Sequence, residues 1–422
     1  MTVSALGAVV GVIVALVAIL KKVSPCYAMM FGALVGGIIG GAGLVDTTAF
    51  MIAGVKNVSS SIIRILTAGV LAGTLIETGA AKRIADFITE KIGAQRSLLA
   101  MMVATTLLTA VGVFGDVACL TVAPIAIQMA KKSGYNKLGV LMALVGGVKA
   151  GGAVAPNPDG IAAAEGFSQP LTSVMAAGIL PMIAALIATG LISHHLAHQG
   201  SSFDDVDAEE DKIADKDLPG VLPAFLGPIV AIALLLLRPI AGITVDPLIA
   251  LPLGGFVGAL AMGKAAHFRE YLVVGISKMS GVAILLVGTG SLAGIISNSN
   301  LSEVIIQAVD AVNLPVFLLA PISGALMAGA TASAVAATTL ASSIFAQTIL
   351  DSGVNGLAAA AMTHVSVFVF DSLPQGPFFH VSAGSVGMSV KERLRLVGWE
   401  SLNGLAMTVT ATLLYGVLGI LG

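Results

Sequence analysis

Long apolar runs, separated by short polar connections, follow one another along the whole chain. The runs are roughly 17 to 20 residues long, which is the length of an α-helix that crosses the hydrocarbon core of a bilayer. The first run extends from Val3 to Leu20. It is followed by Lys21 and Lys22, with no basic residue before it. This order is the reverse of a cleaved signal peptide and predicts a first span with its amino terminus outside.

An internal repeat divides the chain into two copies. Matching motifs lie in the same order about 220 residues apart, as expected of a duplicated unit. The matching stretches are Leu71-Ala72-Gly73 with Leu292-Ala293-Gly294, Pro25, Gly32 and Gly36 with Pro247, Gly254 and Gly258, and 133–138 with 352–357. The expected domains are a first repeat at 1–195, a polar cytoplasmic linker at 196–220 and a second repeat at 221–422.

Each copy is expected to contain about five transmembrane spans and one helical hairpin. The first copy has spans at 4–20, 27–44, 62–79, 138–160 and 172–193, and a hairpin at 97–131 that breaks between Gly112 and Asp116. The second copy has spans at 222–238, 247–263, 280–297, 356–373 and 396–420, and a hairpin at 315–349 that breaks between Gly329 and Ser333. An odd number of crossings per copy inverts the second copy relative to the first. This holds whether the hairpins are re-entrant, as we expect, or span the membrane fully.

The basic residues are distributed unevenly over the two faces of this topology. One face receives all the lysines and arginines except Lys149, which falls within a span, and Lys56, Arg64 and Arg238, which lie on the opposite face. Cytoplasmic loops are rich in Lys and Arg, so the first face is expected to be cytoplasmic and both termini to be outside. The expected location is the bacterial inner membrane.

Composition narrows the function classes further. Hydrophobic residues make up 57% of the chain and charged residues only 10%, against about 25% charged residues in a soluble domain. No basic stripe is present, which argues against nucleic-acid binding. Cys26 and Cys119 lie far apart in apolar surroundings and are expected to be small buried hydrophobic residues. We expect no disulfide, metal site, cofactor or enzymatic activity.

The chemistry is expected where helices break inside the membrane. Irregular backbone at that depth must be buried in protein or line a cavity, and transporters with inverted repeats bind substrates and ions at such breaks. The first hairpin breaks at GVFGDVACLT, residues 112–121. Gly115, Asp116 and Thr121 are candidate substrate-binding residues. Asp116 is also a candidate for the coupling ion, because an intramembrane carboxylate is costly, although it could simply cap a helix.

The second hairpin breaks at GATASA, residues 329–334. Thr331 and Ser333 are candidate substrate-binding residues there. Small hydroxyl side chains can cap a helix N-terminus, and backbone N–H groups at that end favour a negative ligand. The alternative is that these small residues serve only close helix packing.

The span at 138–160 contains GGVKAGGAVAPNPDG, residues 146–160, which cannot sustain an ordinary helix. Lys149, Gly151, Gly152 and Asn157 are candidate substrate-binding residues, and Asp159 is a candidate for the coupling ion. Lys149 could pair with a substrate carboxylate, with Asp116 or Asp159, or could extend to the interface.

The span at 356–373 breaks at a matching position, FDSLPQGP at 370–377. Ser372 and Gln375 are candidate substrate-binding residues. His364 and Asp371 are candidate proton carriers, because both side chains exchange protons and are rare inside membranes. A histidine that is only hydrogen-bonded within the structure is the alternative.

At these four breaks the sequence resembles the gluconate permease family (GntP) of the ion-transporter superfamily. The matching stretches are GDVACLTVAP, GGVKAGGAVAPNPDG, GATASAVAATTLAS and FDSLPQGPFFH. The resemblance covers nearly the whole chain. It implies a homodimer with scaffold and transport regions, re-entrant hairpins, and proton-coupled uptake of hydroxy-acids such as gluconate, glycerate or hydroxybutyrate. Members close to the gluconate permeases carry Pro-Pro-His-Pro where this chain has 155–158 as Ala-Pro-Asn-Pro, which argues against gluconate itself.

The leading hypothesis is therefore a proton symporter that imports a small organic anion, most plausibly a hydroxy-carboxylate. A sodium-coupled carboxylate symporter or an anion exchanger is the closest alternative, because carbonyl, Ser, Thr and Asn oxygens also suit sodium. An intramembrane aspartyl protease would need Asp116 and Asp371 to share a proton. These residues do not occupy matching repeat positions. A passive channel is the remaining alternative.

Overall fold

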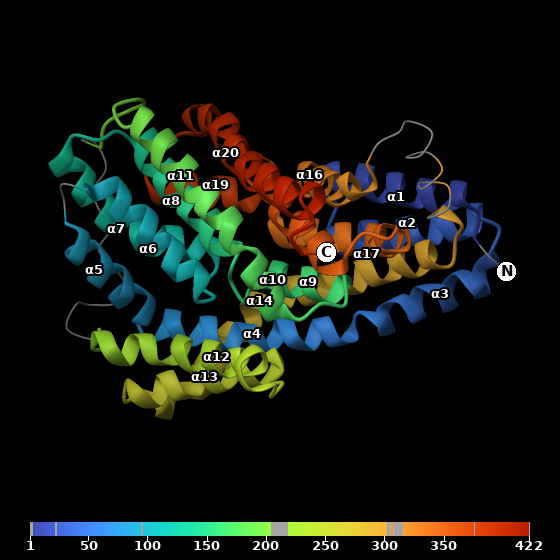
Figure 1. Ribbon diagram of the computed structural model, residues 1–422, viewed down its shortest axis with the longest axis horizontal. Coiled ribbons are helices and arrows are strands. Elements are labelled where there is room, and N and C mark those ends of the chain that lie inside the picture. Colours follow the sequence, from blue (N-terminus) through green and yellow to red (C-terminus); the bar gives the residue numbers. More distant parts are fainter. Residues whose placement is uncertain are drawn as a thin grey trace.

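The computed structural model describes residues 3–421 except 22, 94–95, 204–217, 302–303, 305–306, 308–314 and 375. Helices make up the regular structure of this part of the chain (Figure 1). The one β-type pairing among the described residues is an isolated bridge between Val3 and Ser299. The expectation of an all-α protein is confirmed.

Two helical hairpins lie against long helices of the opposite copy. α1 (Ala5–Leu20) packs on α2 (Pro25–Ile39), and α12 (Val221–Ala241) packs on α13 (Pro247–Ala261). Both α2 and α13 begin with proline, whose missing N–H would have no acceptor at a helix start. α2 contacts α14 (Phe268–Ser297), and α13 contacts α4 (Ser59–Glu77). The first and second halves of the chain are therefore interlocked.

α14 crosses α4 and the preceding α3 (Gly43–Asn57) at two places where the backbones touch. Gly69 of α4 lies against Gly275 of α14, and Gly54 of α3 lies against Gly290 of α14. A Cβ atom added at Gly54, Gly69 or Gly275 would lie under 3.0 Å from backbone atoms of the opposite helix. Gly54 and Gly69 precede Gly275 and Gly290, respectively, by about 220 residues. The two contacts therefore join glycines at corresponding positions of the expected repeats.

Two further hairpins contain the breaks expected from the sequence. α6 (Ser97–Ala110) and α7 (Gly115–Ser133) flank the first, and α16 (Leu319–Thr331) and α17 (Ala334–Asp351) flank the second. Gly112 in the first break has φ of +98°, and Ala332 in the second has φ of +50°. Such left-handed backbone costs little for glycine but about 1 kcal/mol or more for alanine. In both hairpins the backbone therefore reverses direction through a conformation that a continuing helix would not adopt.

Two other spans are interrupted by non-helical turns, as predicted. α8 (Lys137–Gly152) is followed by α9 (Pro158–Gly166). In the second copy, α18 (Gly356–Ser366) and the short η5 (Val367–Val369) are followed by α19 (Pro377–Ser385). α9 packs on α17, and α19 packs on α7. Each second half-helix thus lies against a hairpin helix of the other copy.

The remaining helices complete the periphery. They are α5 (Ala80–Ile92), α10 (Leu171–Ala177), α11 (Ile179–His195), η3 (Ala265–His267), η4 (Val316–Leu318), α20 (Val390–Ala411) and the π-helix η6 (Thr412–Val417). Within the described residues, four helices are individually long and apolar enough to cross a membrane. A fifth span results if α10 and α11, which meet at a 40° bend, are counted together. Shorter apolar helices lie at the expected spans 4–20, 27–44, 247–263 and 356–373.

The structure also corrects some expected boundaries. The connection expected between the spans at 27–44 and 62–79 is the helix α3, which continues almost directly into α4. The span expected at 280–297 is only the second part of α14. The first residues of the expected linker are packed, since Phe203 is buried and the Ser201 N–H donates to Glu392 at 2.7 Å. Most of the linker lies outside the described residues.

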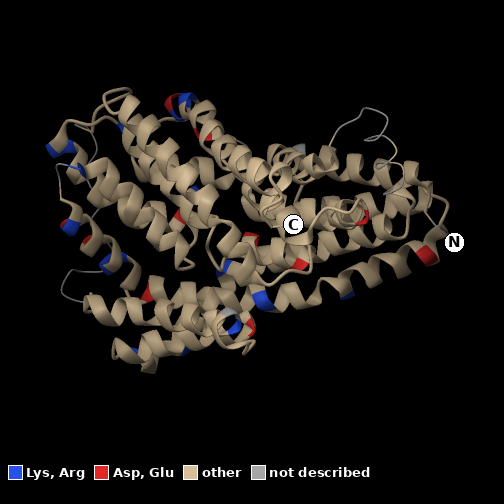
Figure 2. Cartoon of the chain, viewed as in Figure 1, with Lys and Arg blue, Asp and Glu red and all other residues tan. Residues whose placement is uncertain are grey.

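Charged residues are sparse over most of the helical surface and gather towards helix ends and connections (Figure 2). Four groups of charged residues among those described depart from this pattern, because they lie inside the helical packing or join segments far apart in the chain. They are Lys149–Asp371, His364–Asp159, Arg393–Glu400, and Arg64 with Glu165 and Asp246. They are described below.

Candidate functional site

A buried ion pair joins the two broken spans. The Lys149 ammonium on α8 lies 2.6 Å from Oδ1 of Asp371, with the two side chains 1% and 9% exposed. Lys149 also donates to the Phe368 carbonyl at 2.7 Å, and the Ser372 hydroxyl donates to Asp371 at 2.9 Å. The partner of Lys149 is thus Asp371, and not Asp116 or Asp159 as considered from the sequence. Additional hydrogen bonds of this kind are what a buried charge pair requires.

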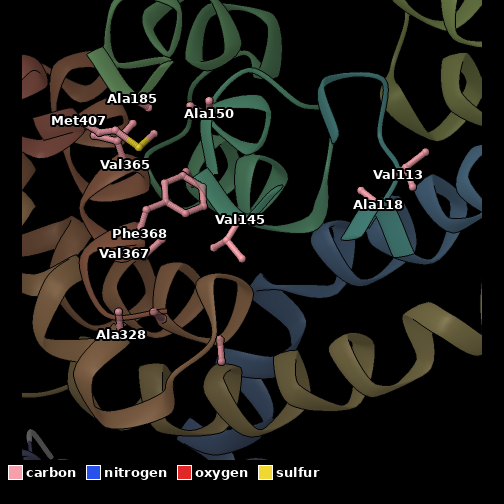
Figure 3. Close-up of a cluster of buried hydrophobic side chains, with 14 of the residues drawn as sticks. Val113, Ala118, Val145, Ala150, Ala185, Ala328, Val365, Val367, Phe368 and Met407 are labelled. Atoms are coloured by element: carbon pink, nitrogen blue, oxygen red, sulfur yellow. The ribbon is translucent and has the colours of Figure 1, made fainter. Parts of the chain in front are cut away.

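Local backbone structure creates this arrangement. The second span leaves regular helical geometry at η5, and the Phe368 carbonyl is thereby available to the lysine. Gly152 on α8 leaves room for the Phe368 ring, since a Cβ there would lie 3.0 Å from the ring. Figure 3 shows this ring extending from its own segment towards the helix that carries Val145 and Ala150. Apolar side chains around the pair exclude water and strengthen its electrostatic attraction.

A second buried acid–base pair lies between the same two spans. Nε2 of His364 on α18 lies 3.3 Å from Oδ2 of Asp159 on α9, and both side chains are almost fully buried. Nδ1 of His364 has no hydrogen-bond partner within the described part of the chain. The imidazole can therefore exchange a proton with Asp159 on one side while its other nitrogen stays available. Both residues are coupling-ion candidates from the sequence, and the structure places them in contact.

The four breaks meet around these pairs. A Cβ on Gly112 would contact the Pro156 ring at 3.9 Å, and one on Gly115 would lie 2.6 Å from a methyl carbon of Val148. The first hairpin therefore touches the first broken span. Gly115 also faces Phe378 of α19, and Gly376 lies against the backbone of Ala332. The second broken span thus touches both hairpin breaks.

Helix N-termini begin at each break. The Asn157 side chain caps α9 by accepting from the Gly160 N–H at 3.1 Å, and Ser333 caps α17 by accepting from the Ala336 N–H at 3.3 Å. Asp116 lies in the first turn of α7, where its Oδ1 accepts from the Val117 N–H at 2.9 Å. Gly376 precedes α19 without a side-chain cap. The N-terminal end of a helix favours an anionic ligand, through its dipole and its first-turn N–H groups.

The other predicted site residues differ in burial and in the elements they contact. Thr331 is half-buried and donates to the Met327 carbonyl at 2.8 Å, and Thr121 is half-buried two turns into α7. Gly151 faces α6, where a Cβ would collide with Thr109, so it lies on the packing side of α8. Gln375 falls outside the described residues.

One buried ion pair was missed by sequence reasoning. Arg393 and Glu400 on α20 are fully buried and paired, with Nη2 to Oε2 at 3.1 Å and a shorter contact from Nη1. Arg393 also donates to Ser382 of α19 at 3.3 Å, and its guanidinium carbon lies 4.9 Å from the centre of the Phe379 ring. The sequence placed Arg393 among the loop cations. The sequence signal that could have found this pair is the spacing of Arg393 from Glu400, which places both side chains on one face of a helix, two turns apart.

A half-exposed charge cluster was also missed. Arg64 of α4 lies 2.6 Å from Glu165 of α9 through Nη1 and 2.6 Å from Asp246 through Nη2. Asp246 caps α13 by accepting from the Leu248 N–H at 2.9 Å. The hydrogen bond from Arg64 is the largest cause that holds the pKa of Asp246 below its ordinary value. The sequence assigned Arg64 only to the face with few basic residues.

No group of three or more His, Cys, Asp or Glu side chains that could hold a metal ion occurs in the described ranges. Two of the carboxylates at the breaks, Asp371 and Asp159, are instead matched with Lys149 and His364. The geometry is that of paired acids and bases at helix ends.

Known proteins with a similar sequence or fold agree with this architecture. The sequence matches the family model of GntP family permeases over residues 3–418. It is 53% identical over 416 residues to an uncharacterized transporter of Haemophilus influenzae, covering 99% of each chain. It is 24% identical to the high-affinity gluconate transporter of Escherichia coli, covering 89% of this chain and 90% of the relative. The D-serine transporter DsdX of the same organism is 22% identical, covering 79% and 80%.

A solved structure shares the fold. The YdaH transporter of Alcanivorax borkumensis, described as having an unusual topology, superposes with a TM-score of 0.65 at 16% sequence identity and 90% coverage of both chains. At this identity the likeness concerns the fold alone. The family-model match and the 53% identical relative confirm the family suggested by the four breaks: this chain is a multi-pass membrane transporter and belongs to the GntP permease family.

Proposed function

We propose that the protein imports a small hydroxylated carboxylate by proton symport, binding it where the four breaks meet. The observation that carries this proposal is the convergence of capped and uncapped helix N-termini on two buried acid–base pairs. Gluconate and D-serine, the ligands in the names of two relatives, both combine a carboxylate with at least one hydroxyl group. Glycerate and hydroxybutyrate share this chemistry.

The substrate carboxylate would be held by backbone N–H groups and hydroxyls. Gly115 and Asp116 of α7, Asn157 before α9, and Ser333 before α17 lie at the N-termini of their helices. Donors of this kind bind a monoanion without a free resident cation. The remaining candidates at or near the breaks are Thr121, Gly152, Thr331, Ser372 and Gln375.

Lys149 has a different proposed role from the residues that bind the substrate carboxylate. Its ammonium already contacts Asp371 and the Phe368 carbonyl. We assign it to holding the two broken spans together, with a substrate carboxylate as a competitor for one of its N–H groups. Gly151, which faces α6, supports the packing of α8 beside it.

Charge balance favours a proton as the coupling ion. The charges of Lys149 and Asp371 cancel, whereas a carboxylate at Asp159 faces a histidine that is cationic only when it carries an added proton. A second negative charge in a poorly hydrated site is strongly unfavourable unless it is neutralised. One proton on the Asp159–His364 pair removes that charge, so substrate and proton would bind together. Asp116 could supply a second proton site.

The topology proposed from the sequence gains support from reciprocal contacts. The Gly69–Gly275 and Gly54–Gly290 contacts exchange the copies, as do the pairings of α9 with α17 and α19 with α7. Inverted repeats at 1–195 and 221–422, both termini outside a bacterial inner membrane, re-entrant hairpins and a homodimer complete the proposal. Sodium coupling is the variant against which it is tested.

Uptake by purified protein in proteoliposomes tests the function. We expect saturable uptake of at least one labelled acid from a panel of gluconate, glycerate, 3-hydroxybutyrate and D-serine, accelerated by an inward proton gradient and unaffected by sodium. His364→Gln should retain counterflow exchange but lose the acceleration by protons. Sodium-driven uptake, or proton-driven uptake that is unchanged in His364→Gln, would contradict the proposed coupling. The absence of any saturable uptake would contradict the function.

A further inference from the structure

Two cavities lie on either side of Glu165, near the end of α9. The α12 cavity, of 270 Å³, is lined by residues that include Arg64, Arg238 and Thr244. The α17 cavity, of 320 Å³, lies between α3, α4 and α14 on one side and α9 and α17 on the other. Glu165 and Ser168 line both cavities. The Glu165 side chain is therefore part of the wall between them.

The two cavities differ in chemistry. The α12 cavity holds the positive charges, since Arg64 and Arg238 line it. The α17 cavity is lined by hydroxyl and amide groups, among them Ser61, Thr339, Ser342, Ser343 and Gln347. α9 and α17 both begin at the breaks described above, so the second cavity extends along the helices that lead to the proposed binding site. Its lining suits a hydroxylated ligand, but it offers no cation of its own.

Arg64 is bound unequally by its two acids. Asp246 holds the guanidinium through two nitrogens, Nε at 2.9 Å and Nη2 at 2.6 Å. Glu165 receives a single contact, from Nη1 at 2.6 Å. Two parallel bonds fix both position and orientation of a guanidinium, whereas a single bond does not. Loss of Glu165 would therefore leave Arg64 in place with one end free for another carboxylate.

This contact is also accessible. The Arg64 and Glu165 side chains are 25% and 27% exposed, and within the described residues the one other side-chain contact of the Glu165 carboxylate is with the Ser60 hydroxyl at 3.0 Å. Ion pairs in such partly hydrated positions contribute about 1 kcal/mol or less. A carboxylate from solution can replace a contact of this strength at low cost, because Arg64 keeps a carboxylate partner and the displaced Glu165, which is partly exposed, keeps the Ser60 hydroxyl.

We propose that the Arg64–Glu165 contact is a substrate-operated gate, in which the carboxylate of an entering hydroxy-acid replaces Glu165 on Arg64 and so joins the two cavities. Arg64 thereby becomes a substrate-binding residue outside the breaks. Glu165 and Asp159 belong to the same short helix, about 9 Å apart along its axis at 1.5 Å per residue. Movement of α9 would therefore alter the gate and the Asp159–His364 contact together. This inference rests on the proposed transport function.

The kinetic test uses variants that are expected to change KM in opposite directions. Glu165→Gln keeps the shape of the side chain but removes the competing charge, so KM should fall about threefold to tenfold. Arg64→Gln removes the receiving charge, so KM should rise about tenfold or more, as expected for a hydrogen bond to a charged group. Arg64→Lys should raise KM by an intermediate amount, because the positive charge remains while the planar guanidinium with its paired N–H donors is lost. Equal impairment by Glu165→Gln and Arg64→Gln would indicate a merely structural ion pair and overturn the gate.

A labelling test measures the opening of the gate in the absence of substrate. Cys26 and Cys119 are both buried, so a cysteine introduced at Ser343 in the α17 cavity can be followed with a charged thiol reagent on detergent-purified protein. Glu165→Gln should raise the labelling rate of Ser343→Cys severalfold. Thr244→Cys, in the α12 cavity, is the matched control and should label equally in both backgrounds. An unchanged Ser343→Cys rate would overturn the gate even if transport is found, whereas absent uptake with an increased rate would contradict only the transport proposal.

Discussion

The Lys149–Asp371 and Arg64–Glu165 pairs have the same separation, 2.6 Å, but very different surroundings. The first is almost completely buried and has further hydrogen bonds from and to its members. The second is about one quarter exposed on each side. Breaking a buried pair by removing one member costs about 3–5 kcal/mol, because a charge is left unpaired in apolar surroundings. An exposed pair contributes about 1 kcal/mol or less.

The difference indicates which contacts can change during transport. A pair as costly to break as Lys149–Asp371 is expected to move as a unit, so it keeps the two broken spans in register. The Arg64–Glu165 contact can open at little cost. Since α9 contributes to the inner pair of Asp159 and His364 as well as to the outer contact, one short helix links the two regions.

The largest expected effect comes from leaving a charge unpaired in the buried pair. Lys149→Met should lower the free energy of unfolding by about 3–5 kcal/mol, because Asp371 then lacks its cation. We expect uptake to fall to background and the thermal midpoint of the detergent-purified protein to drop by several degrees. Static light scattering during heating measures the second effect.

A double variant sharpens this comparison. Lys149→Met with Asp371→Leu removes both charges, and well-packed apolar replacements of buried pairs are often neutral or stabilising. The thermal midpoint should recover while uptake does not. Recovery of uptake as well would show that the pair serves stability alone, and the assigned part of Lys149 would be wrong.

A smaller effect is expected from the packing that holds the Phe368 carbonyl. A Cβ on Gly404 of α20 would lie under 3.0 Å from that carbonyl oxygen, whereas one on Gly398 of the same helix meets nothing within 4 Å. Gly404→Ala should cost about 1–3 kcal/mol through overpacking and reduce uptake. Gly398→Ala is the matched control and should be neutral or slightly stabilising, since alanine favours helix. Equal thermal midpoints for the two variants would contradict this packing.

The smallest effect concerns the exposed cluster at low pH. Arg64 lowers the pKa of Asp246 below its ordinary value of 3.8. A carboxyl group with a lowered folded-state pKa stabilises the fold above its unfolded pKa, and this contribution disappears as the pH falls towards the folded value. Asp246 is about one third exposed, so we expect a change of about 1 kcal/mol or less. Thermal midpoints of wild type and Asp246→Asn should converge below about pH 4, and a constant difference at all pH values would be inconsistent with this linkage.

Much of the fold could be predicted from the sequence because it depends on local patterns. Apolar runs, paired prolines and clustered glycines identified most of the helices and the four breaks, including those beside Asp116 and Asp371, but not the bend between α10 and α11. Helix α3 was missed because its sequence is only moderately apolar and contains Asp46 and Lys56, which resemble a loop between two spans.

The pairing of charged residues could not be predicted in the same way. Asp371 is more than 200 residues from Lys149, and their contact depends on how two broken helices pack. Arg64, Glu165 and Asp246 come from three different helical regions and meet only in the folded chain. Arg393 and Glu400 were within reach of pattern analysis, because both lie on the buried face of α20 with Leu396 between them.

The glycine contacts of α14 with α3 and α4 also set limits on mechanical freedom. Where two helix backbones touch without intervening side chains, sliding along the axis soon drives a neighbouring side chain into the opposite backbone, whereas a small rotation about the contact point does not. The Gly69–Gly275 and Gly54–Gly290 crossings lie on the same helix, α14. Because both crossings involve α14, this helix cannot rotate about one of them while the other stays in contact. α3, α4 and α14 should therefore behave as a rigid frame, against which the half-helices move.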